Sequence, residues 1–368
     1  MKRFIFAAAA LLAIAPSGAM AQAGPGGLQP DDDTPVSRQG TRGANFLNIA
    51  IGARAAALAG AVVGSEEGAT AWYWNPSGMA TAESFTAGFT RQNLYDDLDI
   101  SLNYFGIGIP VFGGVLGAHA TSLNSGDLLR TDEANPDGGN AAFGETFDWN
   151  SSSIGIGYAR RLTDRLNVGA SVKVVNEGMN NASITWGALD AGTTFRTGLY
   201  GLTIGAAIAN VGPSSRMKGA LTERIVNTDQ VSPQVTTFGY DMRDTDLPTL
   251  FRFSVASDLL GSAESLFGAR LGTLHRLTGE AAFSDAIDSN LQSAYALEYS
   301  FANRLFLRGG KRFFNDDRAT GSTGSYGLSG GLGFRLPIGQ AHALRFDYAY
   351  TSFGDLQNVQ VFSFELGR

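Results

Sequence analysis

Histidine and cysteine are residue types that often build catalytic and metal sites, and this chain of 368 residues has few of them. The three histidines, His119, His275 and His342, lie far apart in the sequence, and there is no cysteine. No partner for a nucleophile–base pair and no second metal ligand stands at a diagnostic spacing from them. The sequence therefore predicts a protein that is not an enzyme and that uses no metal or other cofactor.

Arg54 is the charged residue that most needs an explanation, because it lies in an otherwise apolar stretch and a buried charge needs a partner. Four carboxylates are candidate partners: Glu66, Glu67, Glu298 and Asp347. We favour a structural ion pair that fixes the N-terminal part of the chain over direct contact between Arg54 and a ligand.

The elements that must position these charges alternate in polarity, as residues 291–301 illustrate. One face of this segment carries Leu291, Tyr295, Leu297, Tyr299 and Phe301, and the other carries Gln292, Ala294, Ala296, Glu298 and Ser300. Side chains of a β-strand alternate between its two faces, and a transmembrane barrel turns apolar residues toward lipid and polar residues toward its lumen. The pattern predicts a barrel strand with Glu298 in the lumen.

The same pattern recurs over residues 84–368 and predicts an all-β fold, a 14-stranded antiparallel transmembrane β-barrel. The fourteen expected strands are 84–93, 99–109, 114–124, 147–161, 166–177, 183–196, 202–212, 248–259, 266–283, 289–301, 304–314, 325–336, 342–353 and 358–367. Four charges are expected on the lumen wall, forming pairs between strands rather than a selectivity ring: Glu298, Arg335, Arg345 and Asp347.

Connector lengths support this arrangement, because bacterial barrels have short periplasmic turns and longer outer loops. Three long gaps follow odd-numbered strands: 125–146, 213–247 and 315–324. Three short ones follow even-numbered strands: 110–113, 162–165 and 302–303. The asymmetry indicates that the barrel begins and ends on the periplasmic side.

Residues 1–21 have the features of a signal peptide that is cleaved on export. Lys2 and Arg3 precede an apolar stretch at 4–15, and Ala19-Met20-Ala21 fits the cleavage pattern. No later run of 18 apolar residues is present, which excludes a helical inner-membrane protein. We therefore expect the outer membrane of a Gram-negative type cell as the location, with its lipid as a partner. The net charge of −7 and the lack of a basic run after the signal argue against nucleic acid.

Two further segments precede the barrel. Residues 22–43 are rich in Gly, Pro and Asp and are expected to form a flexible lead. Residues 44–83 are apolar and do not alternate, and 49–63 could form a short helix that Gly52 and Gly60 weaken. Fourteen strands enclose a space that must be filled or used, so residues 44–83 are the candidate plug, or hatch.

One stretch of this candidate plug resembles a known family. Residues 52–61 read GARAAALAGA, the pair Glu66-Glu67 follows, and residues 72–79 read WYWNPSGM. This resembles the opening of the PorV/PorQ family, a branch of the FadL-like outer-membrane barrels, as does Phe46-Leu47 just before it. The acidic pair is Asp-Asp in the usual family pattern, and the chain lacks the usual terminal aromatic residue.

The resemblance implies a barrel of fourteen strands with an N-terminal hatch and a role in transport or secretion. A PorV-like protein supports type IX protein secretion, with secreted proteins and secretion-machinery subunits as partners; this is the role we expect first. A FadL-like channel takes up hydrophobic small molecules, and a sealed structural scaffold is a third alternative.

Ten residues are candidates for the hatch and lumen: Phe46, Leu47, Arg54, Glu66, Glu67, Trp72, Trp74, Asn75, Pro76 and Gly78. Trp72 and Trp74 are expected either to line the lumen for an apolar guest or to form an aromatic cluster at the periplasmic interface. Asn75-Pro76 favours a turn. That turn is either a kink beside the ligand path or the junction between the plug and the first strand.

Overall fold

The computed structural model describes residues 40–94, 100–131, 133, 135–138, 146–179, 182–219, 222–227, 235–262, 264–267, 274–314, 327–339, 342–352 and 358–367. The expected signal peptide at 1–21 lies outside the described residues. Of the expected flexible lead at 22–43, only the last four residues are described.

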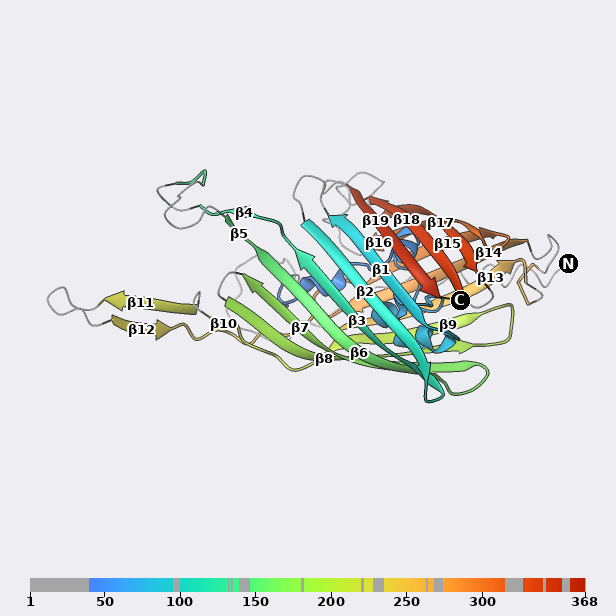
Figure 1. Ribbon diagram of the computed structural model, residues 1–368, viewed down its shortest axis with the longest axis horizontal. Coiled ribbons are helices and arrows are strands. Elements are labelled where there is room, and N and C mark those ends of the chain that lie inside the picture. The colour runs from blue at the N-terminus through green and yellow to red at the C-terminus, as the bar shows by residue number, and fades with distance from the viewer. Residues whose placement is uncertain are drawn as a thin grey trace, which may run out of the picture. The chain divides into compact units, whose positions relative to one another are not determined.

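Fourteen antiparallel strands close into one barrel (Figure 1), which confirms the predicted fold class. They are β1 Thr86–Leu94, β2 Ile100–Val111, β3 Gly114–Asn124, β6 Trp149–Arg161, β7 Leu166–Met179, β8 Ala182–Arg196, β9 Thr203–Val211, β13 Leu250–Leu260, β14 His275–Ala286, β15 Gln292–Phe301, β16 Leu305–Phe314, β17 Leu328–Ile338, β18 His342–Ser352 and β19 Asn358–Gly367. Each pairs with the barrel strand before and after it, and β1 pairs with β19, with Phe89 opposite Phe364.

Five short strands lie in the two longest gaps of the predicted pattern, where no strand was expected. They are β4 Leu128–Leu129, paired with β5 Thr146–Phe147; β10 Lys218–Gly219, paired with β8; and β11 Glu223–Asn227, paired with β12 Val235–Gly239. The expected strand at 266–283 begins only at His275. Leu266 and Phe267 instead lie in the turn after β13, where their N–H groups donate to Asp258 O and Leu259 O.

We call the end of the barrel that carries connectors 125–148 and 212–249 the long-connector end, and the opposite end the short-turn end. The first strand begins and the last strand ends at the short-turn end, as the connector lengths predicted. Two connectors do not have the length expected for their end of the barrel. The turn after β7 at the long-connector end is short, and the connector 261–274 at the short-turn end is long.

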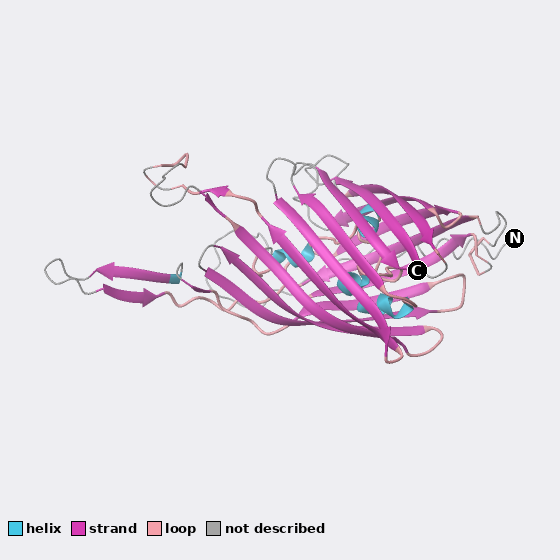
Figure 2. Cartoon of the chain, viewed as in Figure 1, coloured by secondary structure: helices cyan, strands magenta, loops and turns pink. Residues whose placement is uncertain are grey.

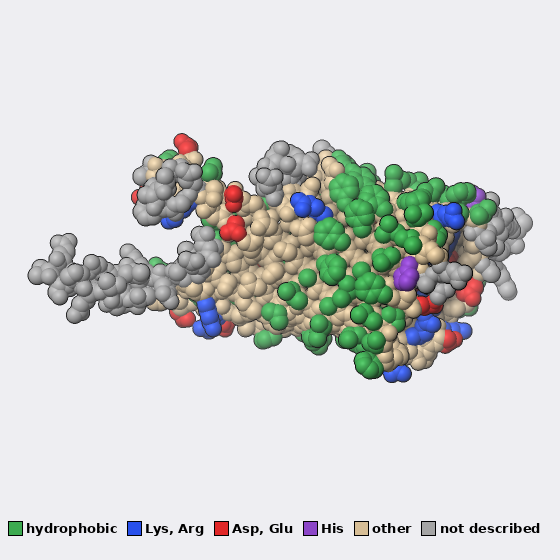
Figure 3. Space-filling model, in the orientation of Figure 1, with side chains coloured by type: hydrophobic (Ala, Val, Ile, Leu, Met, Phe, Trp, Pro, Cys, Tyr) green, Lys and Arg blue, Asp and Glu red, His purple; other side chains and the backbone are tan. Residues whose placement is uncertain are grey.

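The outer face of the wall is apolar where the strands alternate. Tyr295 and Leu297 on β15 are 40% and 53% exposed, whereas Ala294 and Ala296, which alternate with them, are buried on the inner side. Figure 3 shows hydrophobic side chains gathered over the wall toward the short-turn end. A lipid-facing band of this kind is what a membrane barrel requires, because the hydrocarbon core excludes polar side chains.

Four short helices precede β1 within residues 40–85, and Figure 2 shows them among the strands. They are η1 Asn45–Asn48, α2 Ala53–Ala57, α3 Ala71–Trp74 and η2 Pro76–Thr81. The helix expected over 49–63 is reduced to the five residues of α2. Gly52, at φ 96°, precedes the helix, and Ala59 and Gly60, at φ 53° and 85°, follow its C-cap Leu58, so the backbone leaves the helical region on both sides.

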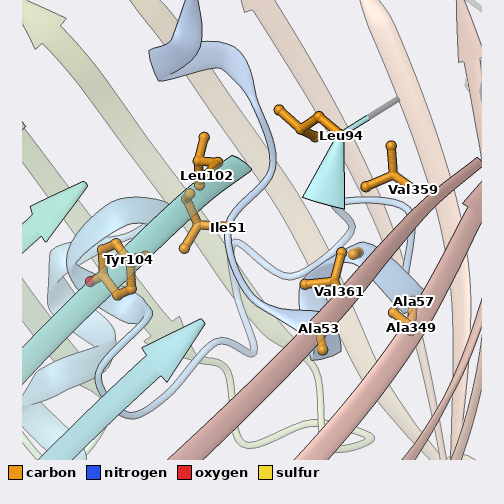
Figure 4. Close-up of a cluster of buried hydrophobic side chains, with 10 residues drawn as sticks. Ile51, Ala53, Ala57, Leu94, Leu102, Tyr104, Ala349, Val359 and Val361 are labelled. Atoms are coloured by element: carbon orange, nitrogen blue, oxygen red, sulfur yellow. The ribbon is translucent and has the colours of Figure 1, made fainter. Parts of the chain in front are cut away.

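Residues 44–82, which we call the N-terminal segment, pack against inward-facing residues of the wall. One cluster joins Ile51 and Ala53 of the segment to Leu102 on β2 and Val361 on β19 (Figure 4). Hydrophobic burial and close packing therefore hold the segment against several strands at once.

Wall glycines allow this close approach. A Cβ added at Gly331 on β17 would lie 2.6 Å from the Cβ of Ala57, and one added at Gly157 on β6 would lie 2.5 Å from the ring of Trp72. Real Cβ atoms do not approach so closely, so a side chain at either position would displace the segment. Part of the high glycine content of the chain is explained by this contact between backbone and segment.

Candidate functional site

Arg54 lies at the centre of an ion-pair network between the N-terminal segment and the wall. Its guanidinium Nη1 is 2.6 Å from Glu66 Oε2 on the same segment, and Nε is 3.1 Å from Glu298 Oε2 on β15. The three side chains are 12%, 3% and 17% exposed. Burial disfavours the charged form of Arg54, but the Glu298 and Glu66 carboxylates outweigh it and raise the pKa of Arg54 well above its ordinary value.

The network continues along the inner face of the wall. Glu298 is 2.5 Å from Arg308 on β16, Arg308 is 2.7 Å from Asp347 on β18, and Asp347 is 2.7 Å from Arg345. We call the six residues Glu66, Arg54, Glu298, Arg308, Asp347 and Arg345 the ion-pair chain. Opposite charges alternate along it, so each charge has a partner although the side chains are largely buried.

Arg308 belongs to the ion-pair chain but was not among the residues predicted from the sequence. The signal was present, because strand register places Arg308 directly opposite Glu298. Three other candidates lie differently. Glu67 pairs with exposed Arg196 at 3.4 Å rather than with Arg54. Asp347 reaches Arg54 only through Arg308 and Glu298, and Arg335 lines the larger of the two cavities described below.

The tryptophans anchor the N-terminal segment through their indole N–H groups. Trp72 is fully buried, and its Nε1 donates to Ile107 O on β2 at 2.9 Å. The Nε1 of Trp74 donates to Ile51 O within the segment at 2.7 Å. Trp74, unlike Trp72, also lines a cavity, which is the position expected of a residue that contacts an apolar guest.

Asn75, Pro76 and Gly78 join the segment to the wall at the start of η2. The Asn75 amide donates to Val63 O at 2.8 Å and to Thr193 O of β8 at 3.0 Å. Pro76 occupies the first turn of η2, where its missing N–H costs nothing. A Cβ at Gly78 would lie 2.1 Å from Glu66 O, so this position needs glycine. The motif thus forms a buried turn between segment and wall.

Phe46 and Leu47 lie toward the long-connector end of the barrel. Both are buried in one cluster with Trp186 on β8 and Leu247. Nearby, the Gly43 N–H donates to Asp246 O at 3.0 Å. The N-terminal segment therefore runs from the long-connector end toward the short-turn end, where β1 begins.

Two cavities lie beside the N-terminal segment. The larger, of about 890 Å³, lies toward the short-turn end and is lined by charges of both signs, among them Arg54, Glu66, Arg196 and Glu365. The smaller, of about 200 Å³, lies toward the long-connector end between the segment and strands β13 to β16. Its lining includes Trp74, Ala59, Leu250, Arg252, Ala282 and Arg312.

A second polar cluster on the wall was not predicted from the sequence. Lys173 Nζ on β7 is 2.7 Å from Asp190 Oδ2 on β8 and 2.6 Å from Asn210 Oδ1 on β9. Asn210, at φ 62°, lies where the register between β8 and β9 shifts. A bulge of this kind is not readable from alternation alone, because it adds one residue to one strand.

The histidines lie on three different strands, His119 on β3, His275 on β14 and His342 on β18. Over the described residues, no group of three or more His, Cys, Asp or Glu side chains is placed to hold a metal ion. None of the helices in the described part of the chain is long and apolar enough to span a membrane.

Comparison with solved structures identifies small-molecule channels. The toluene transporter TodX of Pseudomonas putida has a TM-score of 0.52 at 11% identity over 86% of this chain and 96% of that chain. The toluene transporter TbuX of Ralstonia pickettii gives 0.51 at 11% identity, covering 86% and 97%. The CymD monoaromatic hydrocarbon channel gives 0.51 at 10% identity, covering 86% and 96%.

The chain shares the barrel fold of these solved structures. No protein-family model matches the chain, and no curated protein matches it. The fourteen-stranded barrel that the sequence resemblance implied is therefore confirmed as a fold, whereas the PorV/PorQ family itself stays a prediction.

Proposed function

We propose that this chain is an outer-membrane channel through which hydrophobic small molecules pass, with residues 44–83 as its hatch. One observation carries the proposal: the N-terminal segment packs on the inner face of a fourteen-stranded wall and has a cavity on each side along its path. A molecule entering from the long-connector end would meet the smaller cavity first and would need the segment to move before it reached the larger one.

The contacts of the segment suit a hatch that stays attached while part of it moves. Around α2, the ion-pair chain and the alanine–glycine contacts hold it to β15 to β18. Around η2, Asn75 holds it to β8. Breaking the ion pairs of Arg54 would release the part of the segment around α2 but not the part around η2, because the hydrogen bonds of Asn75 do not involve Arg54.

Two observations support this role over the alternatives. The similar structures with TM-scores above 0.5 reported above are described as small-molecule transporters or channels. The smaller cavity, of about 200 Å³, has room for one small guest, and Trp74, Leu250 and several alanines form the apolar part of its lining. Protein-secretion support, with secreted proteins or secretion subunits as partners, rests on the motif resemblance alone. A sealed scaffold does not account for either cavity.

Uptake by proteoliposomes tests the proposal. Purified chain in vesicles whose outer leaflet is lipopolysaccharide, a layer that slows the passage of hydrocarbons, should speed the entry of radiolabelled toluene relative to the same vesicles without protein, while the entry of a polar sugar of similar size should stay low. Vesicles that carry a denatured sample of the same chain serve as the control. Toluene entry no faster than in empty vesicles would contradict the channel and favour the sealed scaffold.

A further inference from the structure

Arg91 is a positive charge on the outer face of the wall. Its neighbours along β1, Thr90 and Gln92, are buried and point inward, where Gln92 Nε2 donates to Ala50 O at 2.5 Å. Arg91 therefore points outward, and its side chain is exposed. Among the described residues no carboxylate forms an ion pair with it, and its one described side-chain hydrogen bond runs from Nε to Asn93 Oδ1 at 3.4 Å. Its two terminal nitrogens are thus available to a partner outside the chain.

The position of Arg91 along β1 places it at an edge of the lipid-facing band. Phe89, two residues toward the short-turn end, is exposed and apolar, whereas Asn93, two residues toward the long-connector end, is exposed and polar. A charge on the lipid face of a barrel is costly at the middle of the bilayer and nearly free at its surface. Arg91 is therefore expected where the hydrocarbon ends and the lipid head groups begin.

Arg91 begins a row of polar side chains that crosses the neighbouring strands at right angles. Strand register places these residues directly opposite one another from β1 to β8: Arg91, Asn103, Ser122, Ser152, Asn176 and Thr185. The next row toward the long-connector end consists of Asn93, Ser101, Asn124, Asn150, Gly178 and Ser183. We call these twelve residues the polar face. All of them are exposed or half-buried.

The polar face is continuous with the lipid-facing band. The row next to it toward the short-turn end is apolar on five strands: Phe89, Phe105, Ala120, Ile154 and Val174. Barrel strands tilt by about 35–45°, so a row that crosses them at right angles also climbs along the barrel. Figure 1 shows β6, β7 and β8 reaching farther toward the long-connector end than β1 and β2 do. The row therefore leaves the lipid band at Arg91 and rises toward Thr185.

The polar face carries little charge for a surface in contact with water. Arg91 is its only charged residue, whereas about a quarter or more of a typical water-exposed surface is charged. In Figure 3 the wall between the hydrophobic band and the long-connector end is mostly neither hydrophobic nor charged. The carboxylate described in hydrogen-bond contact with the face is that of Asp148, which accepts from Asn150 three strands away from Arg91.

Hydrogen bonds between strands order the amides of the polar face. Asn124 Nδ2 donates to Asn150 Oδ1 at 2.7 Å, and these two residues lie directly opposite each other on β3 and β6. Asn176 Nδ2 donates to Thr185 Oγ1 at 2.8 Å between β7 and β8. An amide has two donors and two acceptor sites, so each of these side chains can also bind a second polar group. The face thus presents ordered, neutral donors and acceptors.

We propose that the polar face binds the head group of a phosphorylated glycolipid of the outer leaflet, of the lipopolysaccharide class. The acyl chains would lie on the apolar row that begins at Phe89. A phosphate would lie against Arg91, whose planar guanidinium can donate two hydrogen bonds to it. The sugars would follow the rising rows of Asn, Ser and Thr side chains. The inference goes beyond the channel and needs only that the chain is an outer-membrane barrel.

The order of the three zones favours a glycolipid over a phospholipid. A phospholipid would match the apolar row and Arg91 but would leave the rest of the polar face to water. A glycolipid continues past its phosphates into sugars, whose hydroxyl groups both donate and accept hydrogen bonds, as the side chains of the face do.

Native mass spectrometry of the purified full chain tests the proposal in octyl tetraethylene glycol ether, a detergent with neither sugar nor charge. The probes are Kdo2-lipid A, lipid A without the Kdo sugars, and phosphatidylglycerol, each added at the same concentration. The fraction of lipid-bound protein should correspond to an affinity for Kdo2-lipid A about tenfold or more above that for phosphatidylglycerol. Lipid A should lie between the two.

Two variants separate the phosphate from the sugars. Arg91→Gln keeps a polar outward side chain but removes the charge, and it should weaken the binding of Kdo2-lipid A about fivefold or more. Its matched control is Arg160→Gln, because Arg160 is an exposed arginine at the short-turn end of β6, outside the polar face. Ser122→Val combined with Ser152→Val replaces two opposite hydroxyls by residues that suit a strand. This double variant should still bind lipid A but lose the preference for Kdo2-lipid A.

Equal binding of Kdo2-lipid A and phosphatidylglycerol would overturn the inference, because it would show attraction of any anionic lipid. Binding that Arg91→Gln leaves unchanged, a double serine variant that keeps its preference for Kdo2-lipid A, or no binding of any probe would overturn it as well. Circular dichroism of each variant keeps a folding defect from being read as a binding defect. Because the inference concerns the outer face of the wall, its failure would leave the channel proposal untouched.

Discussion

Arg54 connects a carboxylate of its own segment to one of the wall, so a single side chain controls two ion pairs. The Glu66 and Glu298 side chains are only 3% and 17% exposed. Removing the arginine would leave the buried Glu66 carboxylate without its described cation and Glu298 with Arg308 alone, and an unpaired buried charge costs more than the ion pair itself contributes. The loss of Arg54 is therefore expected to destabilise the fold mainly because it leaves a buried carboxylate unpaired.

We expect Arg54→Met to lower the free energy of unfolding by about 3 kcal/mol. The measurement is a urea titration in lipid vesicles followed by tryptophan fluorescence. Arg216→Met is the matched control, because Arg216 pairs with Asp244 in an exposed connector and its loss leaves no buried charge. Equal unfolding midpoints for the two variants would contradict the structural role of Arg54.

Wall glycines give a second prediction at the residue scale. A Cβ at Gly169 on β7 would lie 2.4 Å from the carbonyl carbon of Pro76, whereas one at Gly187 on β8 would meet nothing within 4 Å. Gly169→Ala should therefore cost about 1 to 3 kcal/mol through overpacking, and Gly187→Ala should cost much less. The same urea titration compares them, and a Gly187→Ala variant that is the less stable would count against the packing of η2 on the wall.

At the scale of elements, alternation predicted the fourteen barrel strands because each strand has one face toward lipid and one toward the interior. Features that depend on contact between distant elements were not predictable in this way. The expected helix at 49–63 is reduced to α2; Gly52 and Gly60 were recognised as weak points in the sequence, but the positive φ of Ala59 was not. The predicted start of β14, at residue 266, was nine residues too early, because an alternating stretch of sequence lies in the connector before His275.

The candidate site, like the fold, was predictable only in part from the sequence. The need of Arg54 for a carboxylate partner followed from its apolar surroundings, and two of the four candidates, Glu66 and Glu298, are the ones that pair with it. Arg308 and Arg252 escaped notice because each lies in an ordinary alternating strand. The pairing of Arg308 with Glu298 follows from the register of one hairpin, whereas Arg252 has neighbours on the N-terminal segment that only the folded barrel brings to it.

The turn at Asn75 gives a prediction at the element scale. Its side chain bonds Val63 O and Thr193 O and accepts from Ser77 Oγ at 2.7 Å, so it holds the start of η2 on β8. Asn75→Ala should speed amide hydrogen exchange over residues 76–81 while leaving the barrel strands protected. Asn45→Ala, which removes an exposed side chain at η1, is the control. Unchanged exchange in Asn75→Ala would mean that the turn is held by packing alone.

At the scale of the whole molecule, the apolar outer band is narrower than the strands are long. On β6, the outward side chains change from Asn150 and Ser152 to Ile154 and Ile156 toward the short-turn end. The polar parts of the strands would then stand beyond the membrane on the long-connector side, as the outer loops of bacterial barrels do. We expect the chain to remain in the membrane pellet after washing with sodium carbonate, and its release into the supernatant would contradict a membrane barrel.

The central claim is that residues 44–83 close the bore of a fourteen-stranded barrel, and single-channel conductance in planar lipid bilayers tests it most directly. The full chain should conduct ions weakly, while a variant lacking residues 44–82 should give stable openings several times larger, because fourteen strands enclose more space than wall side chains fill. The same low conductance in both would contradict the hatch.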